Sequence, residues 1–399
     1  MEDLGAIVFL PREEDGSSLF LENILFDPAA LWLSAALGRA GVSDFLVVSH
    51  PDDEDAARRC FPENTRFITS VAGHAGESLL SFLEGKNRVA VFTEPVFLSD
   101  EGARTLLGLT GDSLPRGEDS GTYTIPAAAL RDAMERGEDF LPALRSGGSL
   151  FGVRPGLYEG LLPLDRCAPT WDSAQDFARY ASITRLQSEF STAPVRFLDK
   201  SQVYIGPLVT VGGGTVILPG TILRGRTAIG RGCEIGPNTM IRDCVIGDRV
   251  TVNASQLNES TVEDDTTVGP FAYVRPNCHV GRGVKVGDFV ELKNSTIGDG
   301  TKISHLTYVG DTDAGAHINF GCGTVTVNYD GEKKFRTTIG DHAFIGCNTN
   351  LVAPVTVGEG AYTAAGSTIT DNVPPQSLAI ARDRQVVKKN WAAKRRKKS

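Results

Sequence analysis

The chain has 399 residues, of which 41% are hydrophobic and 22% charged, a composition typical of a globular protein of two or three domains. No run approaches about 18 uninterrupted apolar residues, so we expect no membrane span, and a net charge of −9 argues against general nucleic-acid binding. The seven cysteines are scattered without a CxxC pair, which is typical of reduced thiols in a cytoplasmic protein.

The first part of the chain alternates strand and helix patterns. A helix is predicted over residues 27–41, and short apolar runs predict strands at 6–10, 45–49 and 89–92. The acidic beginning does not resemble a signal peptide. Strand–helix–strand alternation predicts an α/β domain with a mainly parallel sheet over residues 1–195, followed by a linker near Ser191–Pro194.

The second part of the chain repeats with a period of six residues. This period fits neither a helix nor a simple alternating strand. It fits a parallel β-helix, in which each hexad supplies one short strand and one corner, and stacked coils bury an aliphatic column. We therefore predict a β-helix over residues 200–384. The inward positions are Ile205, Val211, Ile217, Leu223, Ile229, Ile235, Ile241, Ile246, Val252, Val262, Val268, Val274, Val280, Val286, Leu292, Ile297, Ile303, Val309, Ile339, Ile345, Leu351, Val357, Thr363 and Ile369.

Two segments depart from the repeat. Between Phe320 and Ile339 the hexads stop, and such an insertion in a solenoid predicts a loop on its face, often the binding face. At the end of the chain, residues 385–399 are strongly basic. They are either a solvated, frayed terminus or an arm that meets an anionic ligand, and the sequence leaves both interpretations open.

Five segments carry a resemblance to a known family. In order, they are VGPFAYVRP, VGDFVELKNS, SHLTYVGD, INFGCGTVTVNYDG and LVAPVTVGEGA, between about Val268 and Arg382. They resemble the bifunctional bacterial N-acetylglucosamine-1-phosphate uridyltransferase/glucosamine-1-phosphate N-acetyltransferase family. The implied fold is an α/β nucleotidyltransferase-like domain followed by a left-handed parallel β-helix of hexapeptide repeats.

The resemblance implies a function and a set of site residues. The expected activity is acetylation of glucosamine 1-phosphate by acetyl-CoA, on the route to UDP-N-acetylglucosamine, in a cytoplasmic homotrimer whose basic arm closes a neighbouring subunit's site. His305 would be the catalytic base and Glu291 would orient it. The substrate would be held by Arg275, Lys293, Tyr308, Asn319 and Lys334. The cofactor would be bordered by Cys322, Asn328, Tyr329, Cys347, Ala365 and Arg382.

The residue types suit acetyl transfer. The attacking amine must be neutral, so a base of near-neutral pKa is needed, and histidine has an unperturbed value of about 6.5. A carboxylate beside it would fix its tautomer, and cations would hold the substrate phosphate. A backbone N–H in the loop of the 320s or at 346–348 is a candidate donor to the oxyanion. Two positions depart from the family, which commonly has Ser at position 347 and Ala at 322, where this chain has Cys347 and Cys322.

The N-terminal domain departs further from the family. Where that family has a Gly-rich phosphate loop and a lysine, this chain has FLPREEDGSSLFLENILF, with Glu13, Glu14 and Asp15 in the loop. Glu94 and Asp172 remain at plausible magnesium positions. We favour a degenerate domain over an active, magnesium-dependent uridyltransferase with a divergent loop. Two further alternatives for the whole chain are an acyltransferase for another amino sugar and a structural or ligand-sensing β-helix with an inactive site.

Overall fold

The structure, a computed structural model, describes residues 3–69, 75–108, 120–147, 149–150, 160–165 and 168–396. Lys397 and Lys398 of the basic tail lie outside the described residues. The chain forms two compact units, one of Met1–Thr210 with Ile222–Arg226, the other of Val211–Thr221 with Thr227–Ser399. No described helix combines the length and apolar character that crossing a membrane requires.

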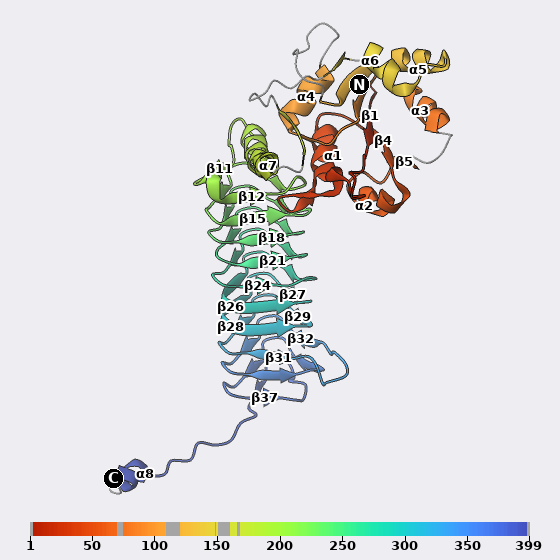
Figure 1. The fold of residues 1–399 in the computed structure, drawn as a ribbon. Helices are drawn as coiled ribbons and strands as arrows, with labels where there is room; N and C mark the ends of the chain where they lie inside the picture. The colour runs from red at the N-terminus through yellow and green to blue at the C-terminus, as the bar shows by residue number, and fades with distance from the viewer. Residues whose placement is uncertain are drawn as a thin grey trace. The chain divides into compact units, whose positions relative to one another are not determined.

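The first unit is built on a six-stranded sheet in the order β5-β4-β1-β6-β8-β9 (Figure 1). β5, β4, β1 and β6 are parallel to one another, β8 pairs antiparallel with β6, and β9 pairs antiparallel with β8. The strands are β1 (Leu4–Phe9), β4 (Asp44–Ser49), β5 (Arg66–Thr69), β6 (Arg88–Phe92), β8 (Thr122–Pro126) and β9 (Ser149–Leu150). The three strands predicted from apolar runs are therefore confirmed. Two small antiparallel pairs accompany the sheet: β2 (Asn23–Ile24) with β3 (Asp27–Pro28), and β7 (Val96–Leu98) with β10 (Leu161–Pro163).

Helices cover both faces of this sheet. Successive residues of β1 point to opposite faces and so enter two different cores. Ala6 and Val8 belong to a core with α1, α2, α4 and α7, and Ile7 belongs to a second core with α3, α5 and α6. The helices are α1 (Ala29–Arg39), α2 (Glu54–Arg58), α3 (Ala75–Leu83), α4 (Asp100–Gly108), α5 (Ala127–Glu135), α6 (Phe140–Gly147) and α7 (Ala168–Ser188), with short 3-10 helices at Leu19–Leu21, Pro51–Asp53 and Lys200–Gln202. The helix predicted over 27–41 is α1.

The hexads form a parallel β-helix, and all the predicted inward positions are buried. The strands up to the end of the uninterrupted repeat are β11 (Arg196–Phe197), β12 (Val203–Ile205), β13 (Thr210–Val211), β14 (Val216–Ile217), β15 (Thr221–Arg224), β16 (Ala228–Ile229), β17 (Glu234–Ile235), β18 (Met240–Arg242), β19 (Val245–Ile246), β20 (Thr251–Val252), β21 (Gln256–Asn258), β22 (Thr261–Val262), β23 (Thr267–Val268), β24 (Tyr273–Val274), β25 (His279–Val280), β26 (Lys285–Lys293), β27 (Thr296–Ile297), β28 (Lys302–Gly310), β29 (Thr312–Ala314) and β30 (Asn319–Phe320). The later strands are β31 (Val325–Val327), β32 (Thr337–Ile339), β33 (Phe344–Ile345), β34 (Asn350–Val352), β35 (Val355–Val357), β36 (Tyr362–Thr363), β37 (Thr368–Ile369) and β38 (Leu378–Ala379).

Equivalent residues of successive coils pair in register and make continuous buried columns. One column runs Ile235, Val252, Val268, Val286, Ile303, Phe320 and Ile345, each the parallel partner of the next. One coil therefore takes 16 to 18 residues over most of this column. The single-residue slips in the hexad pattern fall at corners, where the coil absorbs them without moving the aliphatic residue out of the core.

Replacing Ile303 with alanine tests this stacking. Its side chain is fully buried between Val286 and Phe320, so we expect a loss of about 2–5 kcal/mol of unfolding free energy. Urea unfolding followed by far-ultraviolet circular dichroism measures it. The adjacent exposed Lys302 provides the matched control, and Lys302→Ala should leave the midpoint nearly unchanged. Equal midpoints for the two variants would contradict the stacked core.

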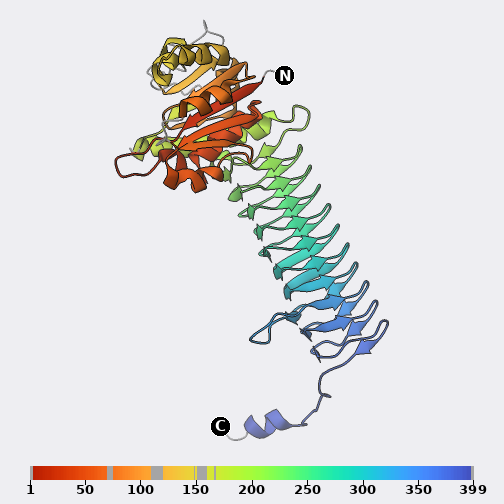
Figure 2. The same cartoon turned by 90° about the vertical axis from the view of Figure 1, so that its right-hand side faces the viewer.

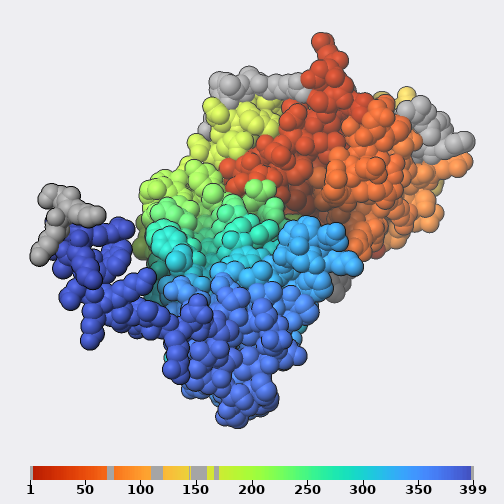
Figure 3. Space-filling view, turned by 90° about the horizontal axis from the view of Figure 1, so that it is seen from below, coloured from red at the N-terminus to blue at the C-terminus, as the bar shows by residue number. Residues whose placement is uncertain are grey.

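The interruption is a short hairpin rather than a break in the solenoid. β31 still pairs with β34 in register, and the chain leaves the coils only after Val327. Tyr329 and Lys334 form an antiparallel bridge around a tight turn, in which the Asp330 carboxylate accepts bonds from the N–H groups of Glu332 and Lys333. Figures 2 and 3 show this loop as a light-blue projection from the coils. The tail carries α8 (Trp391–Arg396), and residues 382–396 are exposed.

Candidate functional site

His305 lies on β28 at a corner of the β-helix, directly in register with Asp288 of β26. Its Nδ1 is 2.6 Å from Oδ1 of Asp288, and both side chains are substantially exposed. This hydrogen bond lowers the pKa of Asp288. The arrangement leaves Nε2 of His305 facing away from its carboxylate partner and available to a ligand. Histidine held at Nδ1 by a carboxylate is the geometry of a general base with a fixed tautomer.

The structure pairs His305 with Asp288 and not with Glu291, the residue that the resemblance implies. Glu291 is in register with Tyr308, not with His305, and it accepts a hydrogen bond of 2.9 Å from Nη1 of Arg275. The reason is the coil length, because a residue lies against the one 17 positions later in this part of the solenoid. Asp288 satisfies that spacing to His305 and Glu291 does not. Glu291 instead balances the charge of Arg275, whose pKa its hydrogen bond raises.

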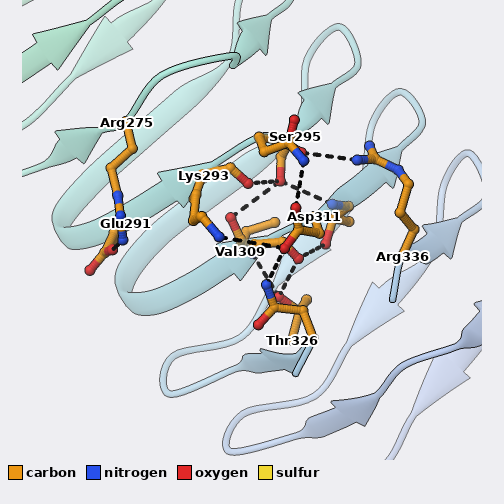
Figure 4. A network of polar contacts seen from close by, with 12 residues as sticks. Arg275, Glu291, Lys293, Ser295, Val309, Asp311, Thr326 and Arg336 are labelled. Carbon is orange, nitrogen blue, oxygen red and sulfur yellow. Dashed lines mark hydrogen bonds and ion pairs between the residues drawn. The ribbon is translucent and has the colours of Figure 1, made fainter. Parts of the chain in front are cut away.

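The predicted phosphate-holding cations lie on neighbouring coils. The register of β24 with β26 places Arg275 beside Lys293. Nζ of Lys293 is 3.6 Å from Oδ2 of Asp311, whose side chain is almost fully buried. In Figure 4, Lys293, Ser295, Val309 and Thr326 surround Asp311, with the Arg275–Glu291 pair to one side.

Asp311 is the centre of a polar network that the sequence motif did not reveal. Its carboxylate accepts hydrogen bonds from the side-chain amides of Asn294 and Asn328. Burial alone would raise the pKa of Asp311, but the two amides together with the charges of Lys293 and Lys334 lower it overall. The network fixes Asn328 and Lys293 relative to each other, so two predicted site residues are positioned by one unpredicted carboxylate.

The remaining predicted substrate residues surround the same region. Tyr308 stacks in register on Glu291, and Asn319 lies one coil beyond Lys302. Tyr329 is 55% exposed on the hairpin, with its hydroxyl donating to the carbonyl of Gly331. Lys334 lies on the opposite arm of the hairpin and acts on Asp311 through its charge. The structure thus gathers the basic and amide groups beside the coils that carry His305.

Three predicted cofactor residues form one column at the same corner as His305. The register of β28, β30 and β33 places His305 opposite Cys322, and Cys322 opposite Cys347. The backbone bonds Asn348 N–H to Cys322 O and Gly366 N–H to Cys347 O continue the column to Ala365. Both cysteines are exposed. Arg382 is exposed. It lies beside this corner, because its Cδ would be 3.7 Å from a Cβ added to Gly366, the residue after Ala365.

The backbone N–H groups of these two cysteines are open. At another corner of the coils, after strands of the nine-stranded sheet, the corresponding N–H is capped by an aspartate of the next coil, as in Arg231 with Asp248 and Ala316 with Asp341. No hydrogen bond from the N–H of Cys322 or Cys347 is present in the described part of the chain. Two uncapped donors therefore lie one and two coils from His305.

Parts of this chain are similar to known proteins. The family model "Bacterial transferase hexapeptide (six repeats)" matches residues 259–294 and 336–371. The bifunctional protein GlmU of Clostridium acetobutylicum is 57% identical over 198 residues, which cover 50% of this chain and 43% of that protein. GlmU proteins of a Geobacillus species and of Clostridium beijerinckii are 44% and 43% identical over 68% and 69% of this chain, covering 61% and 62% of their own lengths.

This chain is similar to GlmU proteins. The chain spans roughly half of the length of the curated GlmU proteins that it matches. An alignment over 68% of the chain is too long to lie within residues 200–399 alone. The similarity to GlmU proteins therefore also includes part of the α/β unit.

The α/β unit has a cavity of about 370 Å³ at the carboxyl ends of β1, β4 and β6. Strand order reverses there, which is where ligands bind in open α/β sheets. It is lined by Phe9, Leu10, Pro11, Arg12, Val48, His50, Thr93, Glu94 and Leu141. Its one arginine is committed to acidic neighbours, because Arg12 donates two hydrogen bonds, of 2.7 and 2.9 Å, to Asp53 and lies 3.4 Å from Asp52.

The predicted magnesium residues do not form a metal site in this structure. Glu94 lines the cavity, whereas Asp172 lies exposed on α7 and is not part of that lining. Within the described ranges, no group of three or more His, Cys, Asp or Glu side chains is placed to hold a metal ion. Glu94 and Asp172 therefore do not line one cavity together.

Replacing Asp288 with asparagine tests its pairing with His305. The carboxylate charge would be lost, so an imidazolium at position 305 would lose its stabilising anion. If the chain transfers an acetyl group, we expect kcat to fall on the order of ten-fold, less than at a buried triad carboxylate. Glu263, which pairs with His279 at 3.0 Å, offers the matched control, and Glu263→Gln should keep its kcat. Equal kcat values for Asp288→Asn and Glu263→Gln would exclude Asp288 from the mechanism.

Proposed function

We propose that this chain transfers the acetyl group of acetyl-CoA to the amine of glucosamine 1-phosphate. The observation that carries the proposal is the corner column in which Asp288, His305, Cys322 and Cys347 lie on successive coils, beside the network of Lys293, Asp311 and Asn328. It is supported by the 57% identity to a GlmU protein over 198 residues.

The proposed catalytic groups remove a proton from the amine and stabilise the negative charge that develops on the thioester oxygen. Nε2 of His305 takes the proton of the amine as its nitrogen attacks the thioester carbonyl. Asp288 holds the imidazole at Nδ1 and stabilises the imidazolium that forms. The uncapped N–H groups of Cys322 and Cys347 are the donors available to the oxyanion, and such a donor contributes about 10²–10³-fold in rate. CoA then leaves as its thiol with the proton returned by His305.

Substrate binding uses the cations beside this corner. Arg275 presents a planar fork and Lys293 a point charge, which together suit a phosphate. Glu291 and Asp311 already partly neutralise them. A phosphate group would share these cations with the two carboxylates, and an amino sugar that lacks a phosphate would not use them.

We also propose that three copies of this chain associate. Three large apolar side chains, Phe271, Phe289 and Leu306, are 59%, 59% and 60% exposed at the corner that carries His305. The rings of Phe271 and Phe289 stack at 5.5 Å, so the ridge is continuous. An apolar ridge of this kind marks a protein interface, and a second and third copy of this chain would cover it next to the site. Light scattering on the intact chain should give three times the mass of one chain.

For the α/β unit we propose no nucleotide transfer. Three acidic residues stand in the loop after β1, and Arg12 is held by Asp52 and Asp53, so no uncommitted cation of the cavity lining faces a triphosphate. The test is to incubate the chain with UTP, N-acetylglucosamine 1-phosphate and magnesium and to measure pyrophosphate. Sustained pyrophosphate release would overturn this part of the proposal.

The acetyltransferase is tested by a panel of acceptors. Initial rates of CoA release are measured with glucosamine 1-phosphate, glucosamine 6-phosphate and glucosamine. We expect kcat/KM to be highest for glucosamine 1-phosphate. A higher value for another amino sugar would assign a different acceptor, and no release with any of them would support an inactive or purely structural β-helix.

A further inference from the structure

The exposed thiols of Cys322 and Cys347 lie on neighbouring coils at one corner. Their positions are fixed by the register Phe320 to Ile345 and by the bond from Asn348 N–H to Cys322 O, 2.8 Å long. The two corners approach closely, since a Cβ at Gly321 would meet the backbone nitrogen of Cys347 at 2.5 Å. Both corners continue into a left-handed residue, Gly323 and Asn348, so the two cysteines project in the same direction.

These two thiols differ from the other cysteines of the described chain. Cys60, Cys233, Cys244 and Cys278 are buried, and burial raises the pKa of each, to about 11 for Cys60 and Cys244. Thiols of that kind are poor nucleophiles at neutral pH. Cys322 and Cys347 are exposed, so a dissolved reagent reaches these two thiols before the buried ones.

We propose that Cys322 and Cys347 form a covalent modification site for low-molecular-weight disulfides, which close them into a reversible intramolecular disulfide. The part of the proposal that concerns inhibition rests on the proposed acetyltransferase function; the bond itself does not. Parallel neighbours are spaced by about 4.8 Å, inside the range of about 4.4–6.8 Å that disulfides need between Cα atoms.

The same spacing indicates that the bond is easily reversed. Parallel side chains keep their Cβ atoms about as far apart as their Cα atoms, and a relaxed disulfide prefers a Cβ separation of about 3.5–4.5 Å. The corners must shift by a few tenths of an ångström to close. Strained, exposed disulfides are readily reduced, which suits a modification that responds to the thiol pool rather than a structural cross-link.

The chemistry is a balanced thiol–disulfide exchange. The thiolate of one cysteine attacks a sulfur of the reagent disulfide, forms a mixed disulfide and releases one reagent thiolate. The thiolate of the second cysteine attacks the protein sulfur of that mixed disulfide and releases the other reagent thiolate. The protein loses two electrons and two protons, and the reagent gains both as two thiols.

Closure alters the proposed catalytic corner directly. Cys322 is the register neighbour of His305, and its N–H and that of Cys347 are the uncapped donors. Drawing the two corners together moves these donors. We therefore expect the oxidised chain to lose acetyl transfer and a reducing agent to restore it.

The test uses the full chain and glutathione disulfide. After incubation, free thiols are blocked, the chain is digested without reduction, and peptides are identified by mass. We expect one cross-link between the peptides of Cys322 and Cys347, while the four described buried cysteines are alkylated only after denaturation. Stable glutathione adducts on both thiols without a cross-link, or no oxidation at either, would overturn the proposal.

Single variants separate the two steps. Cys322→Ala and Cys347→Ser should each trap a glutathione adduct on the remaining thiol, and the double variant should carry neither product. The acetyl-transfer rate of the double variant, relative to its own untreated rate, should not respond to glutathione disulfide. If untreated wild type transfers no acetyl group, the proposed function fails, but the cross-link is still measured by mass.

Discussion

Replacing His305 with alanine is expected to lower kcat for acetyl transfer by about 10²- to 10⁴-fold, because the amine would lose its general base. The side chain is 59% exposed and bonds only to Asp288 among the described residues. Its removal leaves no buried group unpaired, so the unfolding midpoint should stay near that of the wild type. Initial rates of CoA release and urea unfolding measure the two effects.

The chain offers a matched control for this variant. His279 is also an exposed β-helix histidine paired with a carboxylate, Glu263, but it lies on β25, away from the corner that carries His305. His279→Ala should keep both activity and stability. Near-normal activity of His305→Ala, or an equal loss in both variants, would refute the assignment of His305 as the base.

Replacing Asp311 with alanine is expected to destabilise the β-helix by about 3 kcal/mol, because removing one partner of a buried ion pair leaves the other uncompensated. Asn294, Asn328 and Lys293 would all lose their acceptor. The residue also has φ of +49°, a conformation that alanine adopts poorly. The midpoint of urea unfolding should fall, and KM for glucosamine 1-phosphate should rise.

Asp311→Asn separates charge from shape. Asparagine tolerates the left-handed backbone and keeps one oxygen acceptor, so its loss of stability should be smaller than that of alanine. The pKa of Asp311 is lowered in the folded chain from its ordinary value of 3.8. Its contribution is therefore complete above about pH 4 and is lost as the pH falls through the lowered value. Asp311→Asn should lack this acid-dependent part, and wild-type acid sensitivity in that variant would contradict the network.

The periodicity of the sequence was sufficient to predict the β-helix, because a buried aliphatic residue at every sixth position has few other physical solutions. It did not predict which polar residues meet, because that depends on coil length. Asp288 and His305 are 17 residues apart and lie in register, whereas Glu291 falls under Tyr308. Counting back one coil from His305 would have identified Asp288 from the sequence alone.

Other parts of the site could not be predicted from the sequence, for different reasons. Asp311 occupies the last position of the SHLTYVGD segment, yet its burial and three partners arise from residues 17 or 18 positions away on either side. The open N–H groups at Cys322 and Cys347 become visible only by contrast with corners that an aspartate caps. In the α/β unit, the acidic loop was evident from the sequence. The hydrogen bond from Arg12 to Asp53 was not, because the two residues are 41 positions apart and meet only in the folded unit.

The proposed acetyl transfer is tested most directly by the initial rate of CoA release from acetyl-CoA by the intact chain, with and without glucosamine 1-phosphate and with no nucleotide present. We expect rapid release that depends on glucosamine 1-phosphate, yields N-acetylglucosamine 1-phosphate by mass, and is nearly abolished in His305→Ala. A chain that folds normally but releases CoA no faster with glucosamine 1-phosphate than without it would contradict the proposed function.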